Sequence, residues 1–135
     1  MIKLRSVSKN DYRFLYNLLK ERDPNVNISH KTMPTFDEHV AFVSSKPYSC
    51  WYVIEFNGKK SGSIYLSKTD EIGIFIKKSF RGKNLGNTTL ELFLKKHPKS
   101  RYLANVSPKN KKSMKFFKNN GFKLIQYTFE LTKES

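Results

Sequence analysis

The sequence predicts a mixed α/β fold, and three observations support this prediction. The expected elements follow the order strand, two helices, three strands, helix, strand, helix, strand. Strands joined by short turns favour antiparallel pairing, and the strand-helix-strand connections of the second half favour crossovers. With 135 residues, 38% of them hydrophobic, the chain is long enough to bury a core, and we expect one domain over residues 1–135.

The first elements are a strand and two helices. Residues 2–7 alternate apolar and polar side chains like a half-buried strand, and Asn10-Asp11 then offers a cap for a helix that ends near Arg22. Residues 23–34 are polar and contain two prolines, which predicts a loop. Thr35-Phe36-Asp37-Glu38 matches a capping box and opens the second helix.

The remaining elements are a meander followed by two helix-strand units. β-prone runs over 49–56 and 60–67 are separated by Asn57-Gly58, a hairpin signal, and a third strand is expected over 71–77. The later segments are a helix over 85–96, a buried strand over 101–106, a helix over 109–119 closed by Gly121, and a final strand over 122–131. In that final strand the side chains expected to be buried are Phe122, Leu124, Tyr127 and Phe129.

Charge and cysteine content narrow the functional classes. Lys and Arg number 26 against 11 Asp and Glu, and the net charge of +15 favours anionic partners such as phosphates, nucleotides or nucleic acid. Cys50 is the only cysteine, which excludes disulfide scaffolds and cysteine-based metal sites. No apolar run approaches the ~20 residues of a membrane span, so we expect a cytoplasmic protein without a membrane partner.

The stretch FRGKNLGN, residues 80–87, lies between an expected strand and an expected helix. Backbone N–H groups at a helix start converge on anions, and Arg81 and Lys83 add positive charge. The two glycines allow close approach of a phosphate, and Asn84 is the ordinary residue that best tolerates the left-handed region. A plain strand-to-helix turn is the alternative, since neither the P-loop pattern nor the Rossmann spacing is present.

Two further features flank this stretch. Gly73 is isolated in a β-prone strand, where glycine indicates a bulge or a close backbone approach. Residues 105–113 form a strand-to-helix junction rich in side chains that cap helices or bind ligands, and capping alone is the alternative there.

These features together resemble the GNAT superfamily of acyl-CoA-dependent N-acyltransferases. Residues 81–86, Arg-Gly-Lys-Asn-Leu-Gly, resemble the family pattern Arg/Gln-x-x-Gly-x-Gly/Ala and depart from it at Asn84. A second pattern, Asn-x-x-Ser/Ala followed by an aromatic residue and Gly-Phe, is matched by Asn110, Ser113, Phe116-Phe117 and Gly121-Phe122. The element order is similar over nearly the whole chain.

The resemblance implies a central, mostly antiparallel sheet that is splayed at the cofactor site and flanked by about four helices. It implies acetyl-CoA as co-substrate and no metal, with backbone groups near the end of the 71–76 strand binding the pantetheine arm and the 81–87 loop holding the pyrophosphate. The implied cofactor-binding residues are Phe75, Ile76, Arg81, Gly82, Lys83, Asn84, Leu85, Gly86, Asn87, Asn110 and Ser113.

The resemblance also implies direct attack of an amine on the thioester, with an N–H near Ile76 stabilising the oxyanion. Glu71 matches the position where some members carry the general base, although a solvated carboxylate is the alternative. Phe117 occupies the position where many members have a tyrosine that protonates the leaving thiolate. Water or another residue replaces it, or the step needs no acid because a CoA thiol is a tolerable leaving group near pH 8.

The acceptor side is implied to lie near the 23–34 loop, with His30 as a base or hydrogen-bonding group; an exposed loop histidine is the alternative. Trp51 and Tyr52 point to opposite faces of one strand, so one of them, assigned to Trp51, lines the acceptor pocket. The charge suits a small anionic amine such as a nucleotide-linked amino sugar. A peptide or protein N-acetyltransferase, a non-catalytic acyl-CoA binder and a nucleic-acid-binding module are the alternatives, in a monomer or a homodimer.

Overall fold

The computed structural model of the chain describes residues 1–22 and 32–133, and its centre is a four-stranded sheet. The strands are β1 (Ile2–Ser6), β2 (Cys50–Phe56), β3 (Lys59–Leu66) and β4 (Ile72–Ile76). They lie in the order β1-β2-β3-β4, and every neighbouring pair is antiparallel. The expected meander is therefore confirmed, and β1 adds to its outer edge.

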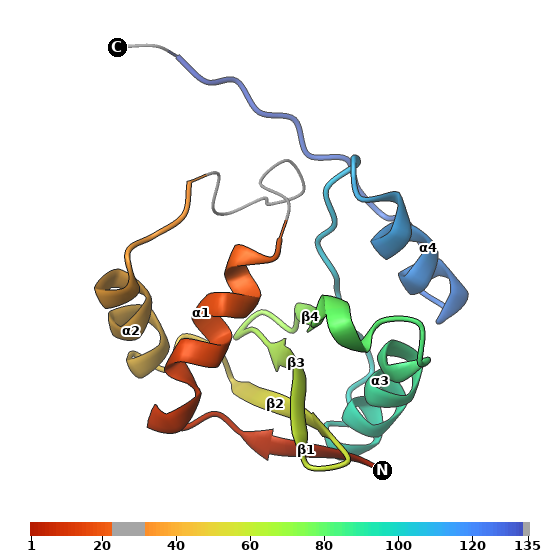
Figure 1. The fold of residues 1–135 in the computed structure, drawn as a ribbon. Helices are drawn as coiled ribbons and strands as arrows, with labels where there is room; N and C mark the ends of the chain where they lie inside the picture. The colour runs from red at the N-terminus through yellow and green to blue at the C-terminus, as the bar shows by residue number, and fades with distance from the viewer. Residues whose placement is uncertain (23–31, 134–135) are drawn as a thin grey trace.

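The helices cover both faces of this sheet. They are η1 (Lys9–Asp11), α1 (Tyr12–Lys20), α2 (Phe36–Ser44), η3 (Lys78–Phe80), α3 (Leu85–Lys96) and α4 (Lys111–Asn119). Helices α1 and α2 lie on one side, and α3 and α4 lie on the other (Figure 1). Within residues 1–22 and 32–133, no helix is long and apolar enough to span a bilayer.

The local signals in the sequence account for where these elements begin and turn. Asn57 and Gly58 both have positive φ, 50° and 80°, as a two-residue hairpin of the favoured primed type requires. Thr35 Oγ1 accepts a hydrogen bond from the N–H of Glu38 at 3.1 Å, and Glu38 Oε1 accepts one from the N–H of Thr35 at 2.8 Å. The expected capping box therefore starts α2.

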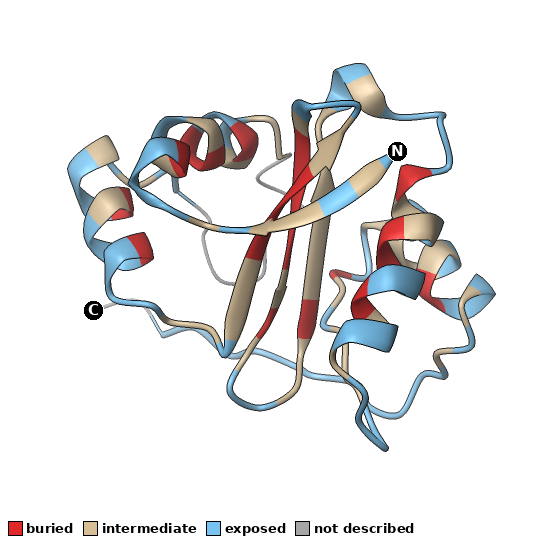
Figure 2. Ribbon diagram, turned by 90° about the horizontal axis from the view of Figure 1, so that it is seen from below, coloured by how far each residue is buried: buried red, intermediate tan, exposed pale blue. Residues whose placement is uncertain are grey.

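The two faces of the sheet carry different side chains. On the α3 side the buried cluster consists of Tyr52, Ile54, Ile64, Leu66, Ile72, Leu90 and Phe93. The neighbouring residues in sequence, such as Trp51 and Tyr65, point to the α1–α2 side because side chains alternate along a strand. Figure 2 shows the buried residues along the centre of the sheet and on the sides of α1 and α3 that face it.

Two expected strands are absent from the described structure. Residues 101–106 make only an isolated parallel bridge, between Leu103 and Glu71, and residues 122–131 form no ladder. Of the four side chains expected to be buried in the last segment, only Phe122 is half-buried, and Phe129 is 91% exposed. Each segment has the residue pattern of a strand, but a strand also needs a neighbouring edge to pair with, which the pattern alone does not supply.

Helix α4 begins at Lys111 and not at 109, because Asn110 is its N-cap.

Candidate functional site

The outer edge of β4 is the first component of the candidate site. The N–H of Ile72 donates to the carbonyl oxygen of Leu103 at 2.8 Å, and no second bridge continues this pairing within the described residues. Backbone groups point to alternate sides of a strand, so those of Ile74 and Ile76 also face outward, toward the gap. We call Ile74 and Ile76 the open edge, because the pairing with residues 101–106 does not continue past the single bridge at Leu103 within the described residues.

The register corrects one of the expected backbone contacts. The N–H of Lys77 donates to the carbonyl oxygen of Ser61 at 2.8 Å, so odd-numbered residues of β4 direct their backbone groups to β3. Phe75 is therefore committed to the ladder, and Ile76 presents its backbone to the gap. The carbonyl oxygen of Ile76 accepts a hydrogen bond from Arg81 Nε at 3.2 Å, which links the open edge to the following loop.

A pocket of about 300 Å³ lies where β4 ends and α3 begins, and we call it the α3 pocket. It is lined by Ile76, Phe80, Arg81, Gly82, Asn84, Leu85, Gly86, Asn87 and Phe116. Seven of the eleven expected cofactor residues are thus brought together, whereas Phe75, Lys83, Asn110 and Ser113 do not line it. Sequence reasoning missed Ile74, Phe80 and Phe116; the aromatic pair Phe116-Phe117 was the available signal for the last of these.

The loop that leads into α3 has the backbone conformation expected of an anion-binding turn. Gly82 has a φ of 84°, and Asn84, the N-cap of α3, has a φ of 59°. The left-handed conformation expected at Asn84 is confirmed, and asparagine tolerates it better than other side chains do. Asn84 Oδ1 accepts from Asn87 Nδ2 at 2.6 Å, so it does not cap the helix N–H groups. Leu85, Gly86 and Asn87 line the α3 pocket, and as the first residues of the helix their N–H groups have no intrahelical acceptor.

Helix α4 closes the other wall of the α3 pocket. A Cβ atom added at Gly86 would lie 3.0 Å from Phe116 Cε1, so glycine allows the two helices to approach here. Asn120 Nδ2 donates to Asn87 Oδ1 at 3.0 Å and joins the end of α4 to the start of α3. The pocket wall is thereby fixed by contacts between helices.

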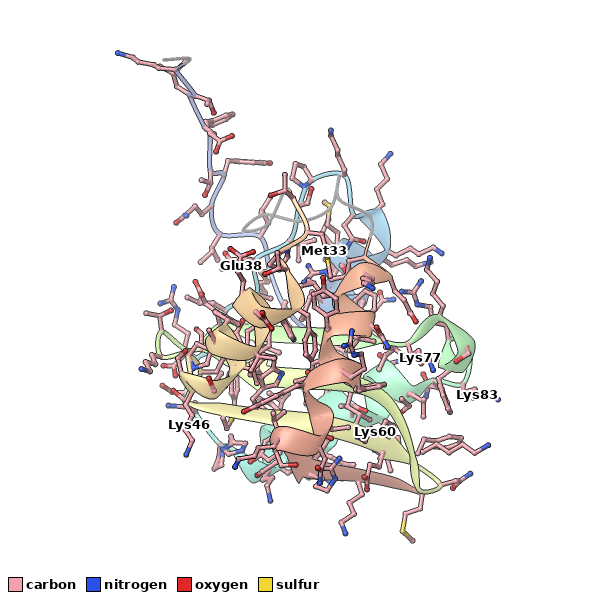
Figure 3. All side chains as sticks on the ribbon, turned by 60° about the vertical axis from the view of Figure 1, so that its left-hand side comes forward. Met33, Glu38, Lys46, Lys60, Lys77 and Lys83 are labelled. Atoms are coloured by element: carbon pink, nitrogen blue, oxygen red, sulfur yellow. The ribbon has the colours of Figure 1, made fainter. Side chains whose placement is uncertain are left out.

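Positive charge surrounds this region unevenly. The guanidinium of Arg81 lies 5.2 Å from the centre of the Phe75 ring, and that of Arg22 lies 5.8 Å from it. Lys83 projects outward from the loop into solvent (Figure 3). Arg81 together with the positive end of the α3 dipole therefore favours an anion in the α3 pocket.

The second motif forms the two ends of α4. Asn110 Oδ1 accepts from the N–H of Ser113 at 3.1 Å, so this side chain serves as a helix cap. At the other end, the N–H of Phe122 donates to Phe117 O at 3.0 Å, and Gly121 has a φ of 90°. Together with the contact between the Phe117 and Phe122 rings, 5.1 Å apart, this is a Schellman cap. Phe117 is 8% exposed and packs in the core.

The opposite face of the sheet carries an aromatic cluster. Tyr65 stacks on Tyr48 with ring centres 3.8 Å apart, and Trp51 Nε1 donates to Ser63 Oγ at 2.7 Å. The pKa of Tyr48 is raised mainly by its burial, and the neighbouring Tyr65 raises it further. Gly73 lies directly under the Tyr65 ring, which a Cβ atom at this position would overlap. The pairing of β3 with β4 is regular there, so Gly73 marks a close side-chain approach and no bulge.

The expected base lies apart from the α3 pocket. Glu71 immediately precedes β4, and its Oε1 accepts from Ser67 Oγ at 3.3 Å. Ile76 is the last residue of β4, so the two residues lie roughly 17 Å apart along the extended chain. The structure thus brings seven of the expected cofactor residues together but does not place Glu71 among them. His30 lies outside the described residues.

Comparisons with known proteins agree with this geometry. The model of the acetyltransferase (GNAT) family matches residues 12–122. A search of curated proteins gives no match. Among solved structures, a domain from Methanocaldococcus jannaschii is 25% identical, with a TM-score of 0.81 over 96% of this chain and 93% of that one.

Two further structures share the fold at lower identity. Spermidine N-acetyltransferase from Vibrio cholerae, in complex with CoA and spermine, is 20% identical, with a TM-score of 0.74 over 89% of this chain and 79% of that one. An aminoglycoside N-acetyltransferase in complex with CoA is 17% identical, with a TM-score of 0.72 over 100% of this chain and 96% of that one. The match of the family model over most of the chain, on a fold shared with these structures, establishes that this chain belongs to the GNAT family and is an acyl-CoA-dependent N-acetyltransferase.

Proposed function

We propose that the chain transfers an acetyl group from acetyl-CoA to the primary amine of a small anionic molecule, such as a nucleotide-linked amino sugar. The observation that carries the proposal is the α3 pocket lying directly beyond the open edge of β4. A diphosphate suits the helix N-terminus, and an extended amide-containing arm suits unpaired strand backbone. The cytoplasm is the proposed compartment, since Cys50 is a free thiol.

Different groups of this chain would bind the different parts of acetyl-CoA. The first N–H groups of α3 and the side chain of Arg81 would hold the pyrophosphate, and the backbone of Ile74 and Ile76 would hold the pantetheine arm. An outward N–H of β4 would donate to the thioester oxygen as negative charge develops on it during amine attack. Acetyl-CoA supplies the acyl group and the thiolate leaving group.

Proton transfer follows from where the titratable groups lie. Glu71 is the proposed base, and its distance from Ile76 requires that the proton reach it through water or that the amine bind toward the start of β4. Phe117 has no proton to give and is buried among aromatic rings. The thiolate is therefore proposed to leave without a protein acid, which its ordinary pKa of about 8.5 permits.

The acceptor is proposed to bind on the aromatic face of the sheet. Tyr48, Trp51 and Tyr65 form stacked and edge-on rings there, which suits a ring-bearing ligand. Arg22 lies close to this face, beside Phe75, and the net charge of +15 favours an acceptor with phosphate groups. Two of the similar structures bear names of enzymes for spermidine and aminoglycosides, so small amines are compatible with this fold.

The cofactor half of the proposal is tested by Arg81→Ala. Loss of a charged hydrogen bond to phosphate corresponds to about 1.5–3 kcal/mol, so the KM for acetyl-CoA should rise by roughly 10- to 100-fold. Lys95→Ala, at the far end of α3 from the pocket and also exposed, is the control with the same charge change and should leave KM unaltered. Equal KM values for the two variants would contradict a pyrophosphate at Arg81.

The acceptor half is tested by an amine panel assayed for CoA release. A nucleotide-linked amino sugar should react with a higher kcat/KM than spermidine or a peptide N-terminus. Faster turnover of spermidine would contradict the anionic acceptor. Binding of acetyl-CoA without turnover of any amine would indicate a non-catalytic binder.

The base is tested by the pH profile of Glu71→Gln, with Glu91→Gln on the exposed side of α3 as control. The Glu71 variant should lose most of its kcat and its acidic pH limb, whereas full rate at every pH would remove Glu71 from the mechanism.

A further inference from the structure

Positive charge is concentrated in one stretch of the second half of the chain. Residues 92–129 contain nine lysines and one arginine but neither aspartate nor glutamate, so this stretch supplies ten of the fifteen net positive charges. The cation that lines the α3 pocket, Arg81, lies outside this stretch. Most of the charge of the chain therefore has no part in the proposed binding of acetyl-CoA.

Helix α4 gathers part of this charge on one side. Lys111, Lys115 and Lys118 follow one another at intervals of four and three residues, so they share a face of the helix, and we call them the lysine stripe. All three are exposed, and their side chains make no hydrogen bond or ion pair among the residues that the structure describes. Helix α4 lies at the margin of the molecule, beside α3 (Figure 1). The lysine stripe is therefore accessible to a large partner.

The lysine stripe is turned away from the candidate active site. Phe117, on the opposite side of α4, is 8% exposed and packs in the core, and Phe116 lines the α3 pocket. At 3.6 residues per turn, the three lysines lie roughly 100–160° around the helix from Phe116. A partner bound to the lysine stripe would consequently leave the α3 pocket open to acetyl-CoA.

The lysine stripe conflicts with the local rules of helix stability. Like charges three or four residues apart destabilise a helix, and both spacings occur here. Lys111 is also the first residue of α4, where the positive end of the helix dipole disfavours a cation, and the first turn contains no acidic residue that would offset it. An ordinary exposed helix mixes both signs of charge. Local conflicts of this kind are expected where a surface serves a function.

We propose that the lysine stripe binds the phosphodiester backbone of double-helical nucleic acid, independently of its base sequence. Lysine is a point charge suited to phosphate, whereas the planar fork that reads base edges belongs to arginine, which α4 lacks. The stripe spans roughly 10 Å along the helix axis. Each strand of a duplex carries a phosphate about every 3.4 Å of its axis, so all three lysines can contact phosphates at the same time.

Other anionic partners suit this surface less well. Single-stranded nucleic acid is bound with exposed aromatic rings on which the bases stack, and the two aromatic residues of α4 face inward. A helix that binds a bilayer needs an exposed apolar face, which the lysine stripe does not offer. Protein interfaces are depleted in lysine and enriched in aromatic residues. A duplex backbone, which needs only positive charges in a row, therefore fits best.

Fluorescence anisotropy with labelled RNA and DNA duplexes of about 20 base pairs tests the proposal. Binding without sequence preference has a Kd of roughly 10⁻⁶–10⁻⁴ M at physiological salt, and we expect saturation in that range. Binding of either duplex supports the proposal and identifies the polymer. No binding of either duplex at about 0.05 M salt would overturn it. So would equal or tighter binding of polyglutamate, or of vesicles of phosphatidylserine and phosphatidylcholine.

Two variants with the same loss of charge locate the binding surface. One removes the stripe, and the other removes three exposed lysines elsewhere: Lys111→Gln/Lys115→Gln/Lys118→Gln and Lys9→Gln/Lys59→Gln/Lys68→Gln. If each stripe lysine neutralises one phosphate, the slope of log affinity against log salt should become shallower by roughly 2–3 in the stripe variant and by less than about 1 in the control. Equal changes in the two variants would show that only net charge matters, which would overturn the stripe as the site.

Lys111→Glu tests the conflict at the start of α4 by a second readout. The substitution places an acid at the positive end of the helix dipole and replaces a repulsive pair with Lys115 by an attractive one. The Tm of the free protein should therefore rise by about 2–4 °C, while duplex binding weakens more than in Lys111→Gln. A lower Tm would show that Lys111 serves the stability of α4, and would contradict the proposal.

Kinetics with acetyl-CoA separate the lysine stripe from the cofactor site. The KM for acetyl-CoA of the triple stripe variant should stay within about twofold of the parent value, since the stripe is turned away from the α3 pocket. A rise of about tenfold would assign these lysines to the phosphates of CoA and overturn the proposal. Because anisotropy measures binding without turnover, a protein that binds duplex but acetylates no amine would still support the proposal.

Discussion

Gly82→Ala tests whether the turn into α3 is the cofactor cradle. Gly82 has a φ of 84°, and an added Cβ atom would meet nothing within 4 Å, so the substitution acts through the backbone alone. A left-handed conformation costs an ordinary residue about 1–2 kcal/mol. If the variant keeps the left-handed conformation in the free enzyme, this conformational cost lowers its free energy of unfolding. If the loop relaxes in the free enzyme, binding of CoA must restore the left-handed conformation, and the cost then weakens binding. The loss of stability and the loss of binding free energy should therefore add to about 1–2 kcal/mol.

Urea unfolding of the free enzyme and calorimetric titration with CoA measure the two parts separately. Gly58→Ala is a matched control, because Gly58 has a φ of 80°, also has open space around it, and lies in the hairpin between β2 and β3. This control should lose about 1–2 kcal/mol of stability with no change in CoA affinity. A Gly82→Ala variant whose two losses together stay below about 0.5 kcal/mol, beside a normally destabilised Gly58→Ala, would refute the reasoning.

Three further substitutions test the supporting structure. Asp11 is fully buried and bonded to Arg5 at 2.8 Å, so Asp11→Ala should cost about 3 kcal/mol or more in urea unfolding. Burial raises the pKa of Asp11, but hydrogen bonds from two cations lower it below the usual range overall. The stabilisation by the ionised carboxylate is therefore present above about pH 4 and is lost as pH falls. The variant should accordingly lose less stability than the parent between pH 7 and pH 3. Gly121→Ala, at a φ of 90°, should lower stability by about 1 kcal/mol, and a larger effect of Gly121→Asn than of the alanine would contradict the left-handed cap. Gly73→Ala should displace the Tyr65 ring and lower the free energy of unfolding by about 1–3 kcal/mol. The Gly73→Ala/Tyr65→Ala double variant should recover most of this loss, because it removes the clash. Losses that simply add in the double variant would contradict the contact.

The features that the sequence predicted well depend on a few adjacent residues. The Asn57-Gly58 hairpin, the capping box of α2 and the left-handed Asn84 each follow from the backbone preferences of the residues themselves. The turn into α3 is of this kind, and that is why most of the α3 pocket could be named in advance.

The features that it predicted poorly depend on distant residues. Glycine is required at position 73 because the ring of Tyr65, on the neighbouring strand, occupies the space of a side chain there. Phe116 lies in the pocket wall because α4 packs on Gly86. Residues 122–131 have the pattern of a strand, but the pattern does not state which edge they pair with. The outward direction of the Ile74 and Ile76 backbone depends in the same way on register, which pattern reading leaves undefined.

The division of the sheet into two faces has a consequence for how the protein tolerates mutation. Along β3 and β4, even-numbered side chains such as Ile64 and Ile72 belong to the buried cluster with α3, whereas odd-numbered ones such as Tyr65 lie on the aromatic face. Saturation mutagenesis scored for abundance and for acetyl transfer should therefore give two tolerance maps with a period of two residues, out of phase with each other. Substrate preference can then drift at one set of positions while the other set preserves the fold.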